Sequence, residues 1–112
     1  MGLLISSKLQ YDQARKEKNL LTYEQTINAN ELEKITSQLS SFKQECKDDG
    51  YKDSEIEDTP YYQELTAKQT AYDTRNDSIA TEIELLDQQM DSFLELHKEG
   101  IQESTTFWCY GG

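Results

Sequence analysis

Apolar residues recur at steps of three and four on both sides of an acidic break near the middle of the chain. Before the break, the pattern consists of Leu32, Ile35, Leu39, Phe42 and Cys46. After the break, it consists of Tyr62, Leu65, Gln69, Tyr72, Asn76, Ile79, Ile83, Leu86, Met90, Phe93 and His97. This spacing places the side chains on one stripe of an α-helix. The pattern predicts an all-α fold, in which two long antiparallel helices form a coiled-coil hairpin.

The chain divides into four expected segments within a single domain covering residues 1–112. We expect a first helix over about 3–48 and an acidic turn over 49–59. A second helix should follow over about 60–99, and a short aromatic tail over 100–112. The tail is rich in β-branched and aromatic residues, which favour extended structure over helix, so it is predicted to be non-helical.

Glycine and proline mark the expected ends of these helices. Gly50 can adopt the left-handed conformation that terminates a helix, and Gly100 is predicted to do the same. Thr59 before Pro60 is typical of a helix start, because the threonine can cap the helix and proline fits the first helical position.

Two asparagines on the stripes predict how the helices align. Asn28 and Asn76 face each other in one of the heptad registers that an antiparallel pair allows. That register is favoured because an unpaired buried amide is costly, and a paired one can fix the register as a single buried asparagine does in coiled coils. A slip of one heptad would place Asn76 against Ile35 instead.

A second apolar stripe follows a shifted frame in the first helix. Leu9, Leu20, Tyr23 and Ile27 fall outside the main stripe and widen the apolar face. A single partner helix cannot cover both stripes, so this half of the chain is expected to contact more than one neighbour.

Apolar residues also gather at both ends of the chain, which a hairpin brings together. Concentrated apolar surface on an otherwise acidic molecule indicates a contact with another molecule. An alternative is that the tail folds back and covers the end of its own hairpin. The expected assembly interface consists of Leu3, Leu4, Ile5, Leu9, Leu94, Ile101, Phe107, Trp108 and Tyr110.

The net charge of the chain bears on which molecules it can bind. The net charge is −11, which argues against nucleic acid and against anionic membrane. Acidic residues concentrate late in the chain: residues 1–47 carry seven basic and six acidic residues, whereas residues 61–112 carry three and ten. No apolar run approaches the length of a transmembrane helix, and the N-terminus lacks the features of a cleaved signal peptide.

No motif in the sequence predicts catalysis, a cofactor or a metal site. The acids of the turn lack the alternating spacing of a calcium-binding loop. His97 is the only histidine and has no cysteine near it, so we expect it to pack or face solvent. Cys46 lies on the stripe as a small core residue, and Cys109 is expected to be free or to pair between chains. The protein is therefore expected not to be an enzyme.

A helical hairpin with two apolar ends lying together resembles the subunits of bacterial secreted filaments. Type III secretion needle subunits and the terminal helices of flagellin-like proteins have this architecture, and Thr59-Pro60 partly matches the proline-containing turn of needle subunits. Ala14-Arg15-Lys16 and Leu85-Leu86-Asp87-Gln88-Gln89 also look like segments of short bacterial helical proteins. The resemblance implies a self-assembling structural subunit, found outside the cell or on its surface after export without a signal. The alternative is a cytoplasmic dimeric adaptor or secretion chaperone that binds a protein client.

Overall fold

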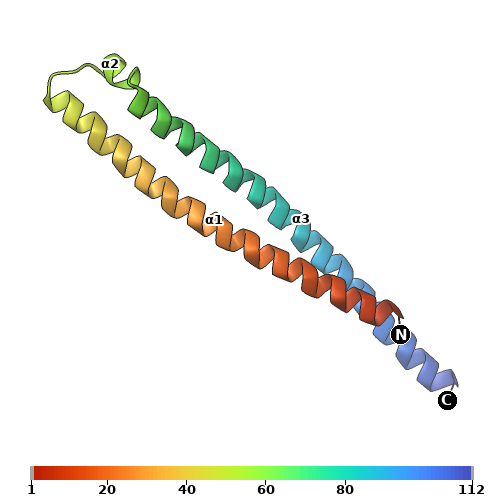
Figure 1. Ribbon diagram of the computed structural model, residues 1–112. Helices are drawn as coiled ribbons and strands as arrows, with labels where there is room; N and C mark the ends of the chain where they lie inside the picture. Colours follow the sequence, from red (N-terminus) through yellow and green to blue (C-terminus); the bar gives the residue numbers. More distant parts are fainter. Residues whose placement is uncertain (1, 112) are drawn as a thin grey trace. The chain divides into compact units, whose positions relative to one another are not determined.

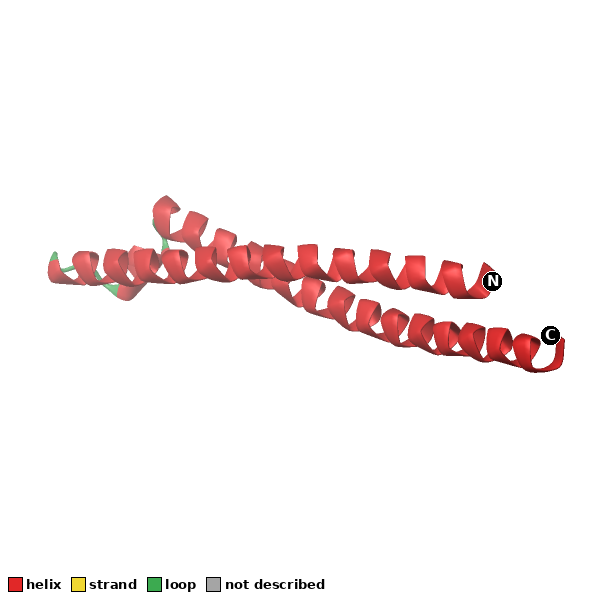
Figure 2. Cartoon of the chain, turned by 90° about the horizontal axis from the view of Figure 1, so that it is seen from below, coloured by secondary structure: helices red, strands yellow, loops and turns green. Residues whose placement is uncertain are grey.

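The protein is an all-α hairpin. The computed structural model describes the backbone of residues 2–111 and the side chains of residues 5–100. Its three helices are α1 (Gly2–Asp48), α2 (Asp53–Glu57) and α3 (Pro60–Gly111). Helices α1 and α3 run antiparallel, and the described backbone contains no strand (Figures 1 and 2). The predicted fold class is confirmed, and the first helix ends where the sequence placed its end.

The chain divides into two compact units, each built from a segment of α1 and a segment of α3. The terminal unit comprises Met1–Thr22 and Ala80–Gly112, so it includes both ends of the chain. The turn unit comprises Tyr23–Ile79 and includes α2. That these two units fold together as the single expected domain stays a prediction.

Helix α1 ends in a Schellman motif centred on Gly50. This residue has a φ of 93°, in the left-handed region that glycine tolerates best. Its N–H donates to the Lys47 carbonyl at 2.9 Å, and the Tyr51 N–H donates to the Cys46 carbonyl at 3.0 Å. These two bonds satisfy carbonyls that the last turn of a helix otherwise leaves without partners.

Helix α2 is a feature that the sequence analysis did not predict within the turn. The Lys52 N–H donates to Glu55 Oε1 at 3.2 Å, which caps the start of this short helix. Ile56 is almost completely buried. Burial of this one apolar side chain and the cap together stabilise a short helix in an otherwise acidic segment.

Helix α3 begins as predicted. The Thr59 hydroxyl accepts a hydrogen bond from the Tyr62 N–H at 3.3 Å, and Pro60 occupies the first helical position. Threonine thus satisfies one of the N–H groups that a helix start leaves free, and proline has none to satisfy.

The predicted helix end at Gly100 and the non-helical tail are wrong. Helix α3 continues through Gly100 to Gly111, and positive φ among the described residues occurs at Gly50 alone. A glycine inside a helix costs about 1 kcal/mol relative to alanine, which weakens a helix without ending it. The chain has one proline, and it lies at position 60, so no proline stops the helix after Gly100. The weak helix formers of the tail each cost less than about 1 kcal/mol.

The core is a thin seam between α1 and α3. In the turn unit it buries Ile35, Leu65 and Ile79 from the predicted stripes, while other stripe residues such as Leu39 and Cys46 are half-buried. The rings of Phe42 and Tyr61 lie 4.7 Å apart, edge to face. A pair of helices has no third layer, so many apolar side chains remain partly exposed.

We predict that Gly50→Ala will lower the free energy of unfolding by about 1 kcal/mol, because a Cβ strains the left-handed conformation. No neighbouring atom lies within 4 Å of the new Cβ, so backbone strain alone should account for the loss. Urea denaturation followed by circular dichroism measures the change. Gly50→Asn is the matched control and should lose less, since asparagine tolerates this conformation. Equal losses for both variants would contradict the explanation.

Candidate functional site

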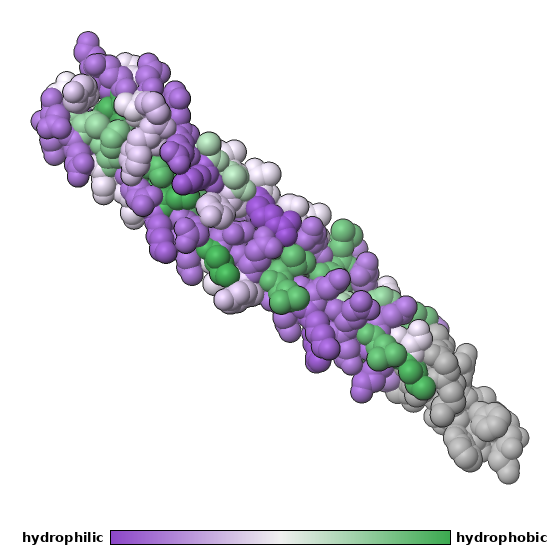
Figure 3. All heavy atoms as spheres, viewed as in Figure 1, coloured by the Kyte–Doolittle hydropathy of each residue, from purple (hydrophilic) through white to green (hydrophobic). Residues whose placement is uncertain are grey.

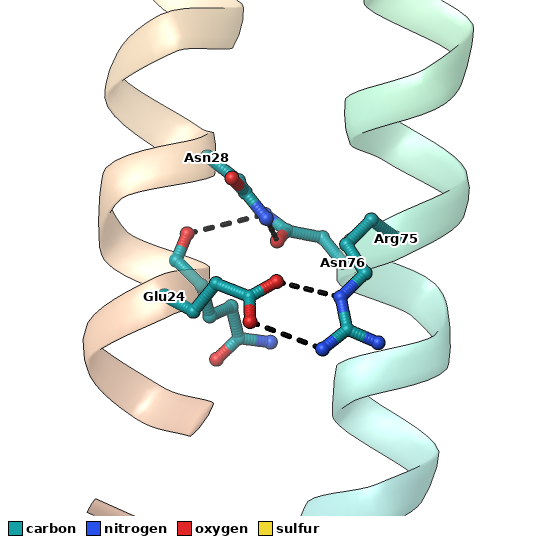
Figure 4. Close-up of polar contacts among 5 residues, drawn as sticks. Glu24, Asn28, Arg75 and Asn76 are labelled. Atoms are coloured by element: carbon teal, nitrogen blue, oxygen red, sulfur yellow. Dashed lines mark hydrogen bonds and ion pairs between the residues drawn. The ribbon is translucent and has the colours of Figure 1, made fainter. Parts of the chain in front are cut away.

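A paired amide layer joins α1 to α3 inside the turn unit. Asn28 Nδ2 donates to Asn76 Oδ1 at 3.0 Å, and Asn76 Nδ2 donates to the Gln25 backbone carbonyl at 3.2 Å (Figure 4). Asn28 is only 6% exposed. The two asparagines therefore lie opposite one another, in the arrangement that the sequence predicted. Together with Gln25 they form what we call the asparagine layer.

An ion pair lies beside the asparagine layer. Arg75 donates to Glu24 through Nε at 2.6 Å and through a terminal nitrogen at 3.0 Å, so the pair is bidentate (Figure 4). The hydrogen bonds from Arg75 hold the pKa of the Glu24 carboxyl below its ordinary value, and partial desolvation opposes this shift. Both side chains are about two-fifths exposed, so solvent screens the pair and its main contribution is geometric.

The asparagine layer can discriminate between registers. In this alignment Asn28 donates to Asn76, and Asn76 donates to the Gln25 carbonyl, whereas a heptad slip would take Asn76 away from the buried Asn28. That the layer selects the register is our proposal, since the structure shows only that the pair forms. The contact Gln69 Nε2 to Thr36 Oγ1 at 3.4 Å is consistent with the same alignment further along the turn unit.

Among the described side chains of the terminal unit, more large apolar residues are exposed than fully buried. Its buried apolar residues among the described side chains are Ala14 and Leu86. Its exposed large apolar residues, which are 40–70% accessible, are Ile5, Leu9, Leu20, Leu85 and Leu94. Apolar side chains are also visible among polar ones on the surface shown in Figure 3.

These exposed residues overlap with the interface expected from the sequence. Ile5, Leu9 and Leu94 are exposed, as an interface requires. The other residues of that predicted interface lie outside the residues whose side chains are described. They are Leu3, Leu4, Ile101, Phe107, Trp108 and Tyr110. Exposure alone does not test the interface, which stays a prediction.

Leu20 and Leu85 belong to the exposed surface but not to the predicted interface. They line an open groove between α1 and α3, which we call the leucine groove. Its lining residues are Glu17, Leu20, Leu21, Glu82, Leu85, Leu86 and Gln89. The shifted stripe contained a signal for Leu20, whereas nothing marked Leu85 except its position next to Leu86 on the main stripe.

The histidine, cysteine and acidic side chains that the structure describes are not gathered into a cluster that could bind a metal ion. Within the described residues no group of three or more histidine, cysteine or acidic side chains is placed to hold a metal ion. The His97 Nδ1 atom is buried and has no hydrogen-bond partner in the described part of the chain. Cys46 is a half-buried free thiol. Among the described residues, no helix is long and apolar enough to span a membrane.

We predict that Asn76→Leu will destabilise the protein by about 1–3 kcal/mol, because it removes the oxygen that accepts from the buried Asn28 amide and the donor to the Gln25 carbonyl. The double variant Asn28→Leu/Asn76→Leu should recover most of that stability, but its two long helices should no longer be held in a single register. Urea denaturation measures the stability of both variants. A cysteine pair at Thr36 and Gln69 reports the observed register, and a pair at Lys43 and Gln69 reports the heptad slip that places Asn76 against Ile35.

The register measurement uses a background in which Cys46 and Cys109 are replaced by serine. With both asparagines present, only the 36–69 pair should oxidise to a disulfide within the monomer. In the double leucine variant, the 43–69 pair should oxidise as well. If the leucine variant forms the 36–69 disulfide alone, the asparagine layer does not select the register.

We predict that Glu24→Gln will lower the melting temperature at pH 7 and that this difference will disappear in acid. The folded pKa of Glu24 is depressed, so the unfolded state takes up its proton first as the pH falls. The stabilisation is therefore complete above the unfolded pKa of about 4.3 and is lost as the pH falls through the folded value. Thermal melts between pH 7 and pH 2 measure the difference.

Glu33→Gln is the matched control for this experiment, because Glu33 is an exposed residue of the same helix and unit. It should show no comparable difference at either pH. A Glu24→Gln effect that persists unchanged in acid would contradict the assignment to the charged pair.

Comparisons with known proteins identify no relative of this chain. No family model, curated protein or solved structure matches the chain.

Proposed function

We propose that this chain is a structural subunit that assembles with copies of itself through the apolar surface of the terminal unit. The observation that carries the proposal is the set of exposed apolar side chains in that unit: Ile5, Leu9, Leu20, Leu85 and Leu94. Contiguous apolar surface on a monomeric protein usually marks a contact with another protein.

Burial energetics support association. Complete burial of one leucine or isoleucine side chain contributes about 1.5–3 kcal/mol, and these side chains are partly buried already. Several of them in one contact can offset the loss of translational and rotational freedom, which costs at least about 4 kcal/mol. The contact would still be modest in strength, as expected of subunits that exchange before they polymerise.

The placement of the chain ends supports a filament or needle-like assembly. Both ends belong to the terminal unit, where the sequence also concentrates apolar residues. In the secreted filament subunits that the architecture resembles, the joined ends line the filament. On this proposal the protein acts outside the cell or on its surface.

We predict that the average mass of the purified protein will rise with concentration and that Ile5→Ser/Leu9→Ser will suppress the rise. Removing these side chains deletes apolar surface that is 58% and 64% exposed and therefore should not unfold the monomer. Sedimentation velocity over a hundredfold concentration range measures the mass, and electron microscopy of the most concentrated sample detects polymers.

The control is Tyr51→Ser, which removes a side chain of similar exposure, 55%, from the turn unit. It should assemble like the wild type. A wild type that stays monomeric at every concentration would contradict the proposal. A fixed dimeric mass would favour the closed adaptor or chaperone instead, since an open contact keeps growing.

A further inference from the structure

We infer that the leucine groove of the terminal unit binds the outer face of α1 from a second copy of the chain. This inference rests on the proposed function and names the two surfaces that meet. The face consists of Ile5, Leu9 and Lys16, and we call it the α1 ridge.

The leucine groove offers an apolar floor with acidic edges. Leu86 is buried and Leu21 is half-buried, whereas Leu20 and Leu85 are 70% and 53% exposed. The groove thus combines two exposed leucines, one on each helix, with two leucines that are wholly or partly covered, and this apolar lining can contact apolar side chains of another molecule. The charged side chains that line the groove are Glu17 and Glu82, and both are acidic.

The α1 ridge offers the complementary features. Ile5 and Leu9 each lie two positions from the buried Ser7, and Lys16 lies two positions from the buried Ala14. In a helix of 3.6 residues per turn, two positions is slightly more than half a turn, so all three residues lie on the side of α1 opposite its buried residues. Two apolar side chains and one lysine therefore share one outward face.

Charge favours this pairing. Lys16 makes no ion pair within the described part of the chain, so its ammonium can approach a carboxylate of another copy. The other charged residue on the same side, Asp12, is paired with Arg15 at 3.8 Å. A ridge with a cation meets a groove with acidic edges, and the partly neutralised ridge avoids the repulsion that two acidic α3 helices would have.

The two surfaces adjoin on α1. Leu20 lies four positions from Lys16 and eleven from Leu9, so it shares the side of α1 that carries the ridge, whereas the rest of the groove lies where α1 meets α3. The ridge and the groove are nevertheless different patches, so a contact between the ridge of one copy and the groove of another is heterologous. Such a heterologous contact generates rings or open filaments rather than a closed dimer.

The first experiment mixes two variants that each lack one surface. Leu9→Ser damages the ridge and leaves the groove intact, whereas Leu85→Ser damages the groove and leaves the ridge intact. Each variant alone should stay monomeric in sedimentation velocity at concentrations where the wild type assembles. An equal mixture should form a one-to-one dimer and nothing larger, because the intact groove of one variant accepts the intact ridge of the other.

Circular dichroism melts of each variant establish that it is folded, and Tyr51→Ser again serves as the assembling control. If the wild type assembles and Leu85→Ser assembles equally well, this inference is wrong while the proposed function stands. If the mixture stays monomeric although both single variants are folded, the ridge and the groove are not partners. If the wild type itself is monomeric, both proposals are wrong.

A second experiment tests the charge on the same contact. Lys16→Glu and Glu17→Lys should each weaken assembly roughly two- to fivefold, the range expected of an exposed ion pair. The double variant Lys16→Glu/Glu17→Lys has the net charge of the wild type and should regain part of the lost affinity. Assembly that is unchanged by all three variants would exclude Lys16 from the contact.

Discussion

The paired amides of Asn28 and Asn76 are the interaction that we propose to fix the alignment of α1 and α3 in the turn unit. Asn28 donates to Asn76, and Asn76 donates to the Gln25 carbonyl. A purely apolar seam permits slips of whole heptads, because packing leucine against isoleucine stabilises the pair almost as much as packing leucine against leucine. A buried amide tolerates no such slip. We therefore propose that the polar layer supplies the register specificity that the apolar seam lacks, at little net gain in stability.

The two-helix architecture also explains why apolar side chains remain exposed to solvent. A hairpin of two helices has one seam, and every apolar residue off that seam meets solvent unless another chain covers it. In the turn unit, α2 adds a small third element and buries Ile56. In the terminal unit the described residues include no such element, and leucines remain exposed on both α1 and α3. The exposed surface is thus a consequence of the architecture, and we regard assembly as its use.

The sequence predicted features that depend on local chemistry or on periodicity. The end of α1 at Gly50 and the start of α3 at Thr59 and Pro60 follow from backbone preferences that act within one turn. The pairing of Asn28 with Asn76 follows from periodicity extended across two helices. These predictions needed no knowledge of tertiary contacts beyond the antiparallel arrangement itself.

The features that the sequence did not predict depend on weaker or non-local terms. Helix α2 is stabilised by the burial of Ile56. The acidic composition of the turn does not predict that this side chain is buried. Helix α3 passes through Gly100, since a glycine inside a helix costs about 1 kcal/mol and weakens the helix without ending it. Leu85 was missed because adjacent leucines on a helix point in different directions, and only the structure shows that its side is left open.

The central claim is that copies of the chain meet through their terminal units. Zero-length carboxyl–amine cross-linking of a mixture of ¹⁴N- and ¹⁵N-labelled protein tests it most directly, because mixed-isotope peptides identify contacts between chains. The account predicts mixed-isotope cross-links that join Lys16 of one copy to Glu17 or Glu82 of another. Inter-chain cross-links confined to the turn unit, or a complete absence of mixed-isotope peptides from concentrated protein, would contradict it.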